Sequence, residues 1–211
     1  MPKRPTSRRL LWIAATLGLS TCSAPLALAQ PVLDPTSPEV RQLPSDASRF
    51  TPLHVAAMKG DILTIQDLLD QGVPVDIRVE NGFFRGATPL MMAARDADAA
   101  TMAFLLDRGA DVNARDDRRV SVLMWASSTG GSVEKIALAL ERGADVNPRA
   151  VEGDTALQWA AGLGRDPRMV ELLVKAGAGV DVPDDRGRTP LMTAARVGNA
   201  GAVKILLDAG A

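Results

Sequence analysis

The feature that most constrains this chain is a tandem repeat that begins after position 50. Five segments start alike, and they are TPLHVAA at Thr51, TPLMMAA at Thr88, SVLMWAS at Ser121, TALQWAA at Thr155 and TPLMTAA at Thr189. The spacings between successive starts are 37, 33, 34 and 34, and each start is followed by a second apolar stretch that ends in glycine. A period of this size predicts a solenoid of stacked two-helix units.

The residue types at the expected helix ends agree with two-helix units. The hydroxyl side chain that opens each repeat suits a helix N-cap, because its oxygen can accept a free backbone N–H of the first turn. Proline follows directly at Pro52, Pro89 and Pro190, where it removes no helical hydrogen bond. Glycine lies just past each second helix, where a left-handed residue can end a helix. These glycines are Gly72, Gly109, Gly143, Gly177 and Gly210.

The connecting segments carry the most specific motifs. GADVNAR (109–115) and DDRGRTPL (184–191) fit a pattern that runs TPLHxAAxxG, then LLxxGADVN, then a hairpin into the next Thr-Pro. Residues 51–211 therefore resemble ankyrin repeats, with repeats that start near 51, 88, 121, 155 and 189. The resemblance implies an all-α solenoid of five helix-turn-helix units with short β-hairpin-like connecting loops.

The chain departs from this pattern at several positions. In the resemblance, a histidine near the start of each repeat ties neighbouring loops by hydrogen bonds. Only the first repeat keeps it, and flexible methionine packing is expected to replace the tie elsewhere. The five residues in this slot are His54, Met91, Met124, Gln158 and Met192. Trp125 and Trp159 follow in the next slot and are interpreted as packing between repeats. Extra residues are expected around Gly130-Gly131 and Arg165.

Residues 1–29 are interpreted as a secretory signal peptide. Four basic residues precede the short apolar run LLWIAATLGLS, and Ala27-Leu28-Ala29 resembles a cleavage site, so we expect a cut between Ala29 and Gln30. An uncleaved membrane anchor, a twin-arginine signal, or a lipid anchor at Cys22 are alternatives. Residues 30–50 contain four prolines, and we interpret them as a linker or an N-terminal cap.

Removal of this segment changes the charge of the protein. The whole chain has 24 basic and 25 acidic residues, and the leader holds four of the basic ones and none of the acidic ones, which leaves a net charge of −5. That sign argues against nucleic acid as a partner. Cys22 is the only cysteine, so the exported chain would have no thiol. These features predict a periplasmic or secreted protein without membrane insertion after cleavage.

Catalytic and metal-binding patterns are weak in this sequence. His54 is the only histidine, and its place in the repeat favours a structural role. No zinc site of ordinary composition, no Ser-His-Asp set and no phosphate-binding glycine loop can be assembled. Asp116-Asp117 and Asp184-Asp185 are interpreted as solvated pairs at hairpin tips. We therefore expect no enzymatic activity, no metal and no cofactor.

Protein binding is the remaining function that the sequence favours. The resemblance implies a concave surface made by the hairpin tips and the first helices, and Arg and aromatic residues are the types that interfaces favour. The candidate partner-binding residues are Phe83, Phe84, Arg85, Arg95, Arg118, Arg119, Glu152, Leu163, Arg186, Arg188 and Arg196.

Three of these candidates lie in an insertion. The first spacing, which is the longest, predicts four extra residues around Gly82 to Arg85, after the turn signal Asn81-Gly82. Phe83 and Phe84 are then either exposed binding anchors or rings that fold back over the first repeat.

Two other functions stay open at this stage. The last apolar stretch, AVKILLDAGA, offers no polar outer face, which favours a subunit of a larger envelope assembly. An enzyme with an unrecognised site is the weaker alternative.

Overall fold

The structure is a computed structural model that describes residues 50–164 and 166–211. The signal peptide, Cys22, residues 30–49 of the linker and Arg165 lie outside the described residues. Ten helices follow one another in the described part. They are α1 (Pro52–Lys59), α2 (Ile62–Asp70), α3 (Pro89–Asp96), α4 (Ala99–Asp107), α5 (Val122–Ala126), α6 (Val133–Glu141), α7 (Ala156–Gly162), α8 (Pro167–Lys175), α9 (Pro190–Val197) and α10 (Ala200–Asp208).

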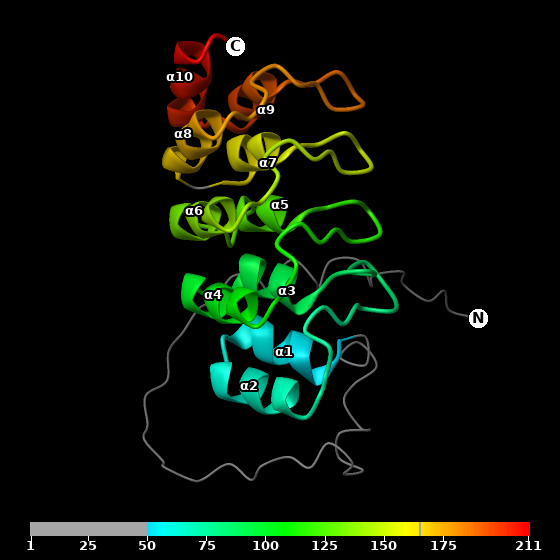
Figure 1. Ribbon diagram of the computed structural model, residues 1–211. Helices are drawn as coiled ribbons and strands as arrows, with labels where there is room; N and C mark the ends of the chain where they lie inside the picture. The colour runs from blue at the N-terminus through cyan, green and yellow to red at the C-terminus, as the bar shows by residue number, and fades with distance from the viewer. Residues whose placement is uncertain (1–49, 165) are drawn as a thin grey trace, which may run out of the picture. The chain divides into compact units, whose positions relative to one another are not determined.

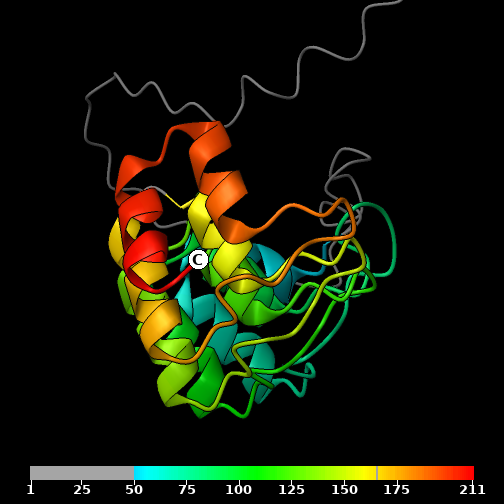
Figure 2. The ribbon, with the colours of Figure 1, turned by 90° about the horizontal axis from the view of Figure 1, so that it is seen from above.

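The described helices form five antiparallel pairs stacked in chain order (Figure 1). The first helix of each pair packs on the first helices of its neighbours, and α4, α6, α8 and α10 form a second layer. The segments that join one pair to the next project to the same side of both layers, as the view along the stack shows (Figure 2). The predicted all-α solenoid of five two-helix units is confirmed.

The helix ends explain why the chain folds at these positions. Thr88, Ser121, Thr155 and Thr189 each accept the expected backbone N–H three residues on. All five glycines past the second helices have φ between 84° and 91°, the left-handed region that glycine adopts without strain. The Ala pairs at 56–57, 93–94 and 160–161 are buried, which lets the two layers approach closely.

Thr51 is the exception among the predicted N-caps. Its hydroxyl makes no capping bond to α1 and lies 2.8 Å from His54 Nδ1 instead. His54 Nε2 lies 3.0 Å from the Ala87 carbonyl oxygen. A carbonyl oxygen can only accept, so Nε2 carries the hydrogen and Nδ1 accepts from the hydroxyl. Burial lowers the pKa of His54, which agrees with a neutral ring that links the first repeat to the next hairpin.

The expectation that methionine packing replaces this link in the other repeats needs correction at two positions. Met192 of the fifth repeat is exposed, and the fourth repeat keeps a hydrogen-bonded link. Gln158 occupies the histidine slot of the fourth repeat and donates from Nε2 to the Arg188 carbonyl oxygen at 2.7 Å. Its Oε1 accepts the Thr155 amide N–H at 3.0 Å. An amide offers a donor and an acceptor, as a neutral imidazole does, so glutamine keeps the link. Met91 and Met124 are buried as expected.

Candidate functional site: the hairpin surface and its aromatic row

Four hairpins join the five helix pairs, and we refer to them as the first (73–87), second (110–120), third (144–154) and fourth (178–188) hairpins. Asparagine side chains connect three of them. Asn113 donates to the Gly143 carbonyl oxygen at 3.0 Å and accepts the Asp145 N–H at 2.8 Å. Asn147 repeats both bonds one hairpin further on, at 3.1 and 3.0 Å. Each asparagine therefore fixes the spacing of two hairpins.

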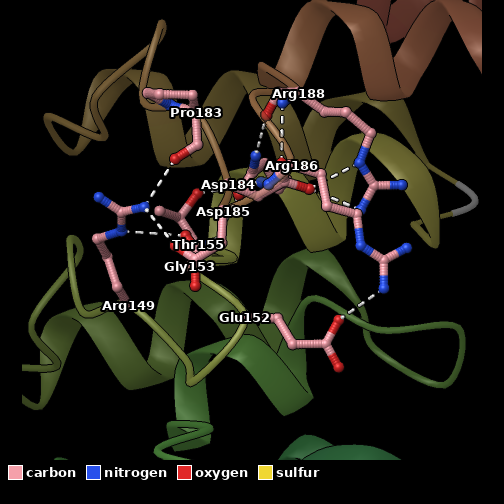
Figure 3. Close-up of polar contacts among 10 residues, drawn as sticks. Arg149, Glu152, Gly153, Thr155, Pro183, Asp184, Asp185, Arg186 and Arg188 are labelled. Carbon is pink, nitrogen blue, oxygen red and sulfur yellow. Dashed lines mark hydrogen bonds and ion pairs between the residues drawn. The ribbon is translucent and has the colours of Figure 1, made fainter.

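Arginines brace the same hairpins from within. Arg149 donates to the Gly153 carbonyl oxygen of its own hairpin at 3.1 Å and to that of Pro183 in the fourth hairpin at 2.8 Å (Figure 3). Arg78 does the same in the first hairpin, where it reaches the Arg115 carbonyl oxygen at 2.8 Å. Backbone bonds between adjacent tips add to this bracing. They run from Asp117 N to Arg85 O, from Val151 N to Arg118 O and from Asp185 N to Glu152 O. The hairpin surface is thus held in place by its own hydrogen bonds.

The first hairpin contains the predicted four-residue insertion. Its closing bonds join Val79 to Gly86, seven positions on, whereas the fourth hairpin closes between Asp184 and Gly187, three positions on. Gly82 has a φ of 87°, but no other residue of this turn except Gly86 has a positive φ. The Asn-Gly pair therefore marks a turn, as expected, although it does not form the two-residue turn with both residues left-handed.

The two phenylalanines of this insertion have different environments. Phe83 is 65% exposed, and the Arg118 guanidinium lies over its ring at 3.9 Å from the centroid. Phe84 is half-buried, and its ring centroid lies 5.6 Å from that of Phe50 and 5.8 Å from that of Trp125. Phe83 is thus exposed, as one alternative from the sequence expects, although its role as a binding anchor stays a prediction, and Phe84 folds back onto Phe50 and Trp125 rather than only over the first repeat. Phe84 packs back against the stack, and Phe83 faces solvent.

Phe84 is part of a longer row of rings. Trp125 on α5 meets Trp159 on α7 edge to face, with centroids 5.3 Å apart, so Phe50, Phe84, Trp125 and Trp159 form a continuous chain of ring contacts. We call these four residues the aromatic row. The Arg95 guanidinium lies 4.8 Å from the Phe84 ring and 5.7 Å from the Trp125 ring. Contacts of this kind between a cation and a ring are attractive.

Polar atoms without partners lie beside the row. Trp125 Nε1, Arg118 Nε and Nη2 and Asp116 Oδ2 are buried, and none has a hydrogen-bond partner among the described residues. Arg118 Nη2 and Asp116 Oδ2 lie 3.7 Å apart, which is an ion pair but too long for a hydrogen bond. Burial raises the pKa of the Asp116 carboxyl, and the N–H donors of Val120 and Arg118 offset only part of this effect. Each unpaired buried polar group costs about 1–3 kcal/mol of stability.

The structure brings four of the predicted site residues together, namely Phe83, Phe84, Arg95 and Arg118. The others make no ring contact with this cluster among the described residues. Arg85 pairs with Asp117 at 3.0 Å, Arg186 with Glu152 at 3.5 Å, and Arg188 with Asp184 at 2.6 Å (Figure 3). The remaining three, Arg119, Leu163 and Arg196, are exposed. Binding roles for these residues stay predictions.

The aromatic row adds three residues to this cluster, Phe50, Trp125 and Trp159, that are not among the predicted site residues. Trp125 and Trp159 were interpreted as packing between repeats, and they do pack together, but they also continue the row from Phe84. Phe50 was assigned to the linker, and nothing in its sequence context points to a ring contact with the first hairpin. The pair of tryptophans in the same slot of two successive repeats was the available signal.

Two further findings concern the described residues only. No group of three or more His, Cys, Asp and Glu side chains in residues 50–164 and 166–211 is placed to hold a metal ion. Among the helices of this same part, none combines the length and the apolar character that crossing a bilayer requires.

The last helix pair, α9 and α10, exposes three large apolar side chains to solvent, namely Met192, Val197 and Leu207.

Stacked helix pairs joined by projecting hairpins define this protein as a helical repeat solenoid. The family model described as ankyrin repeats (3 copies) matches residues 11–116 and 123–211, and the chain belongs to this family. A search among curated proteins gives no match. Ankyrin repeats are generally protein–protein interaction modules and are typically not enzymes.

Proposed function

We propose that this protein binds another protein through the hairpin surface, with the aromatic row and its two arginines at the centre of the interface. The observation that carries the proposal is the uninterrupted contact of Phe50, Phe84, Trp125 and Trp159, with Arg95 stacked against two of these rings. Tryptophan and arginine dominate the binding energy of protein interfaces when they cluster.

The rigidity of the surface supports the same proposal. Side chains of Asn113, Asn147, Arg78 and Arg149 already fix the hairpins to one another. A surface that is ordered before binding loses little conformational entropy when a partner docks. The exposed Phe83 ring at the edge of the row then adds apolar area to an ordered platform.

A site-specific crosslinking experiment tests this proposal. A photoreactive phenylalanine analogue is placed at Phe83 in the full-length chain, and the same analogue is placed at Leu63 as the matched control. Leu63 on α2 is 76% exposed and Phe83 is 65% exposed, so the control position is at least as accessible, but only Phe83 borders the row. We expect a discrete protein adduct from position 83 in native cells, none from position 63, and loss of the adduct after Arg95→Ala.

The opposite pattern would contradict the proposal. Equal adducts from both positions would mean that position 83 reports only general collisions, and no adduct from position 83 would mean that the row is not covered by a protein. Circular dichroism of Arg95→Ala separates loss of binding from loss of the fold.

We further propose that the protein acts in the periplasm or outside the cell. The basic start, the short apolar run and the Ala27-Leu28-Ala29 site support export. The mass of the chain purified from its native cells tests this directly. A chain that starts at Gln30 in the periplasmic or secreted fraction is expected, and a chain in the cytosol that keeps the segment 1–29 would contradict export.

A further inference from the structure

One edge of the Arg118 guanidinium group, beside the aromatic row, is buried and makes no hydrogen bond with the described residues, and we call it the open edge. Nε and Nη2 are the two nitrogens of that edge, and both lack a hydrogen-bond partner within residues 50–164 and 166–211. Trp125, which is 5% exposed, adds a third unpaired donor at Nε1, and the Arg118 guanidinium lies 6.0 Å from its ring. In this part of the chain the unpaired buried side-chain atoms are three donors and one acceptor, Asp116 Oδ2, so donors are in excess beside the row.

The fourth hairpin shows what such an edge binds when it is filled. There the Nε and Nη2 atoms of Arg188 lie 2.7 and 2.6 Å from the same oxygen, Oδ2, of Asp184 (Figure 3). A guanidinium edge binds a carboxylate strongly because its two N–H donors are charged and ionised carboxylate oxygens only accept, here with both donors on one oxygen. In the second hairpin, Asp116 approaches Arg118 Nη2 only to 3.7 Å and does not fill the edge.

The surroundings of the open edge add two requirements. Phe83 covers the face of the Arg118 guanidinium with an apolar ring, and Arg95 lies beside Trp125. Asp116 and Asp96 lie 3.7 and 3.4 Å from these two arginines and offset their charges, so it is the unpaired Nε and Nη2 donors of Arg118 that favour an acceptor group with an apolar neighbour.

We propose that Arg118 and Trp125 form a carboxylate subsite that receives an aspartate or glutamate side chain of the protein partner, with an apolar partner residue against Phe83. The inference deepens the proposed function and rests on it for the nature of the partner. The donor atoms are buried in the free protein, so entry of the carboxylate requires the side chains around Arg118 to move, among them the Phe83 ring over the guanidinium. The large exposed fraction of Phe83, 65%, means that movement of its ring uncovers little of its own area.

The indole N–H signal of Trp125 in a nitrogen–proton NMR spectrum tests the subsite in the full-length protein. The probes are N-acetyl-glutamate N-methylamide and, as its uncharged match, N-acetyl-glutamine N-methylamide. We expect the carboxylate probe to shift the Trp125 signal saturably in the millimolar range. The glutamine probe should need at least a tenfold higher concentration to give the same shift. The indole signal of Trp159 should move less than that of Trp125.

Two variants make the test specific. Arg118→Gln should abolish the response, whereas Arg142→Gln, a change at an exposed arginine that caps the C-terminus of α6, should leave it intact. Circular dichroism shows that both variants are folded. The subsite is wrong if the signal does not move, if both probes act equally, if Arg118→Gln still responds, or if inorganic phosphate alone produces the shift.

The result is separate from the crosslinking experiment. A protein adduct at Phe83 with no indole response would overturn the carboxylate subsite and leave the proposed function in place. An indole response that follows these expectations without any adduct would support the subsite and contradict the proposed function.

Discussion

The second and fourth hairpins share a backbone path but differ in how their polar groups are satisfied. In each, a buried aspartate accepts two backbone N–H groups of its own turn, at 2.9 and 2.8 Å in both cases. Asp184 then binds the Arg188 guanidinium, while Asp116 has Val120 at the corresponding position. One exchange of arginine for valine therefore leaves Asp116 Oδ2 without a hydrogen bond among the described residues.

The two hairpins also carry different residues at the left-handed position of the tip. Gly187 has a φ of 75°, and the residue in the same place in the second hairpin is Arg119, with a φ of 61°. Arg119 is the one non-glycine residue with a positive φ among the described residues. Strain and unpaired polar groups that coincide at one place are typical of functional sites, because natural sequences otherwise remove them. The comparison thus singles out the second hairpin, beside the aromatic row.

The largest expected difference is between asparagine substitutions of the two aspartates. Asp184→Asn replaces Oδ2 by an N–H₂ group that faces the Arg188 donors. We expect it to lower the free energy of unfolding by about 1.5 kcal/mol. This value lies in the lower part of the range for charged hydrogen bonds, because Arg188 is partly solvated. Asp116→Asn keeps the acceptor for both backbone N–H groups and removes a buried charge, so it should change stability by less than about 0.5 kcal/mol.

Urea denaturation followed by circular dichroism measures both values. Equal losses in the two variants would show that Asp116 and Asp184 are equally satisfied in solution, and the contrast between the hairpins would then fail.

A smaller effect is expected from exchange of the tip residues. Arg119→Gly should raise the free energy of unfolding by about 1 kcal/mol, because it removes the strain of a side chain in the left-handed region. Gly187→Ala should lower it by about the same amount for the same reason. Thermal melts of both variants check these signs. A stabilising Gly187→Ala would mean that the tip conformations do not follow the φ angles given above.

The sequence allowed most of the fold to be predicted, because its signals are local. Thr88, Ser121 and the glycines after the second helices act within one or two turns of chain, so their positions define helix ends without knowledge of the partners. The insertion in the first hairpin followed from spacing alone. The prediction of Thr51 as an N-cap was wrong because it used local signals only. The His54 ring bonds both Thr51 and the distant Ala87 carbonyl oxygen, and no local motif shows this link.

The candidate site was harder to predict because its contacts join residues far apart in the chain. Phe50 meets Phe84, and Phe84 meets Trp125, across three repeats, so no motif contains the row. It was equally hard to predict which arginines form ion pairs. Arg118 and Arg188 looked equivalent as tip residues, and only the positions of Asp116 and Asp184 relative to them decide which guanidinium is engaged.

The pH dependence of stability should also differ in sign between the two hairpins. Burial raises the pKa of Asp184, but the donors of Arg188 and Arg186 outweigh it and the pKa lies below 3.8. Ionised Asp184 therefore stabilises the fold above pH 3.8, and this contribution is lost as the pH falls through the lowered pKa. The pKa of Asp116 lies above 3.8, so its contribution is present below pH 3.8 and is lost as the pH rises through the raised pKa.

The free energy of unfolding of the native chain and of Asp116→Asn, measured by urea denaturation between pH 3 and 7, isolates the contribution of Asp116. The stability of Asp116→Asn relative to the native chain should increase as the pH rises above about 3.8, the ordinary value for aspartate. A constant difference over the whole range would show that the carboxyl of Asp116 is not perturbed.

The smallest expected effect concerns the ring that covers the second hairpin and has no counterpart in the fourth. Phe83→Ala removes a contact with the Arg118 guanidinium, which is worth about 0.5–1 kcal/mol at an exposed site. It also lets water reach buried N–H donors that lack a partner in the described part of the chain, and this gain opposes the loss. The net change in the free energy of unfolding should therefore stay within about 0.5 kcal/mol.

Phe84→Ala is the matched control. It should lower the free energy of unfolding clearly more than Phe83→Ala does, because the Phe84 ring contacts Phe50 and Trp125. If Phe83→Ala were as destabilising as Phe84→Ala in urea denaturation, the ring would be part of the core rather than a cover over Arg118.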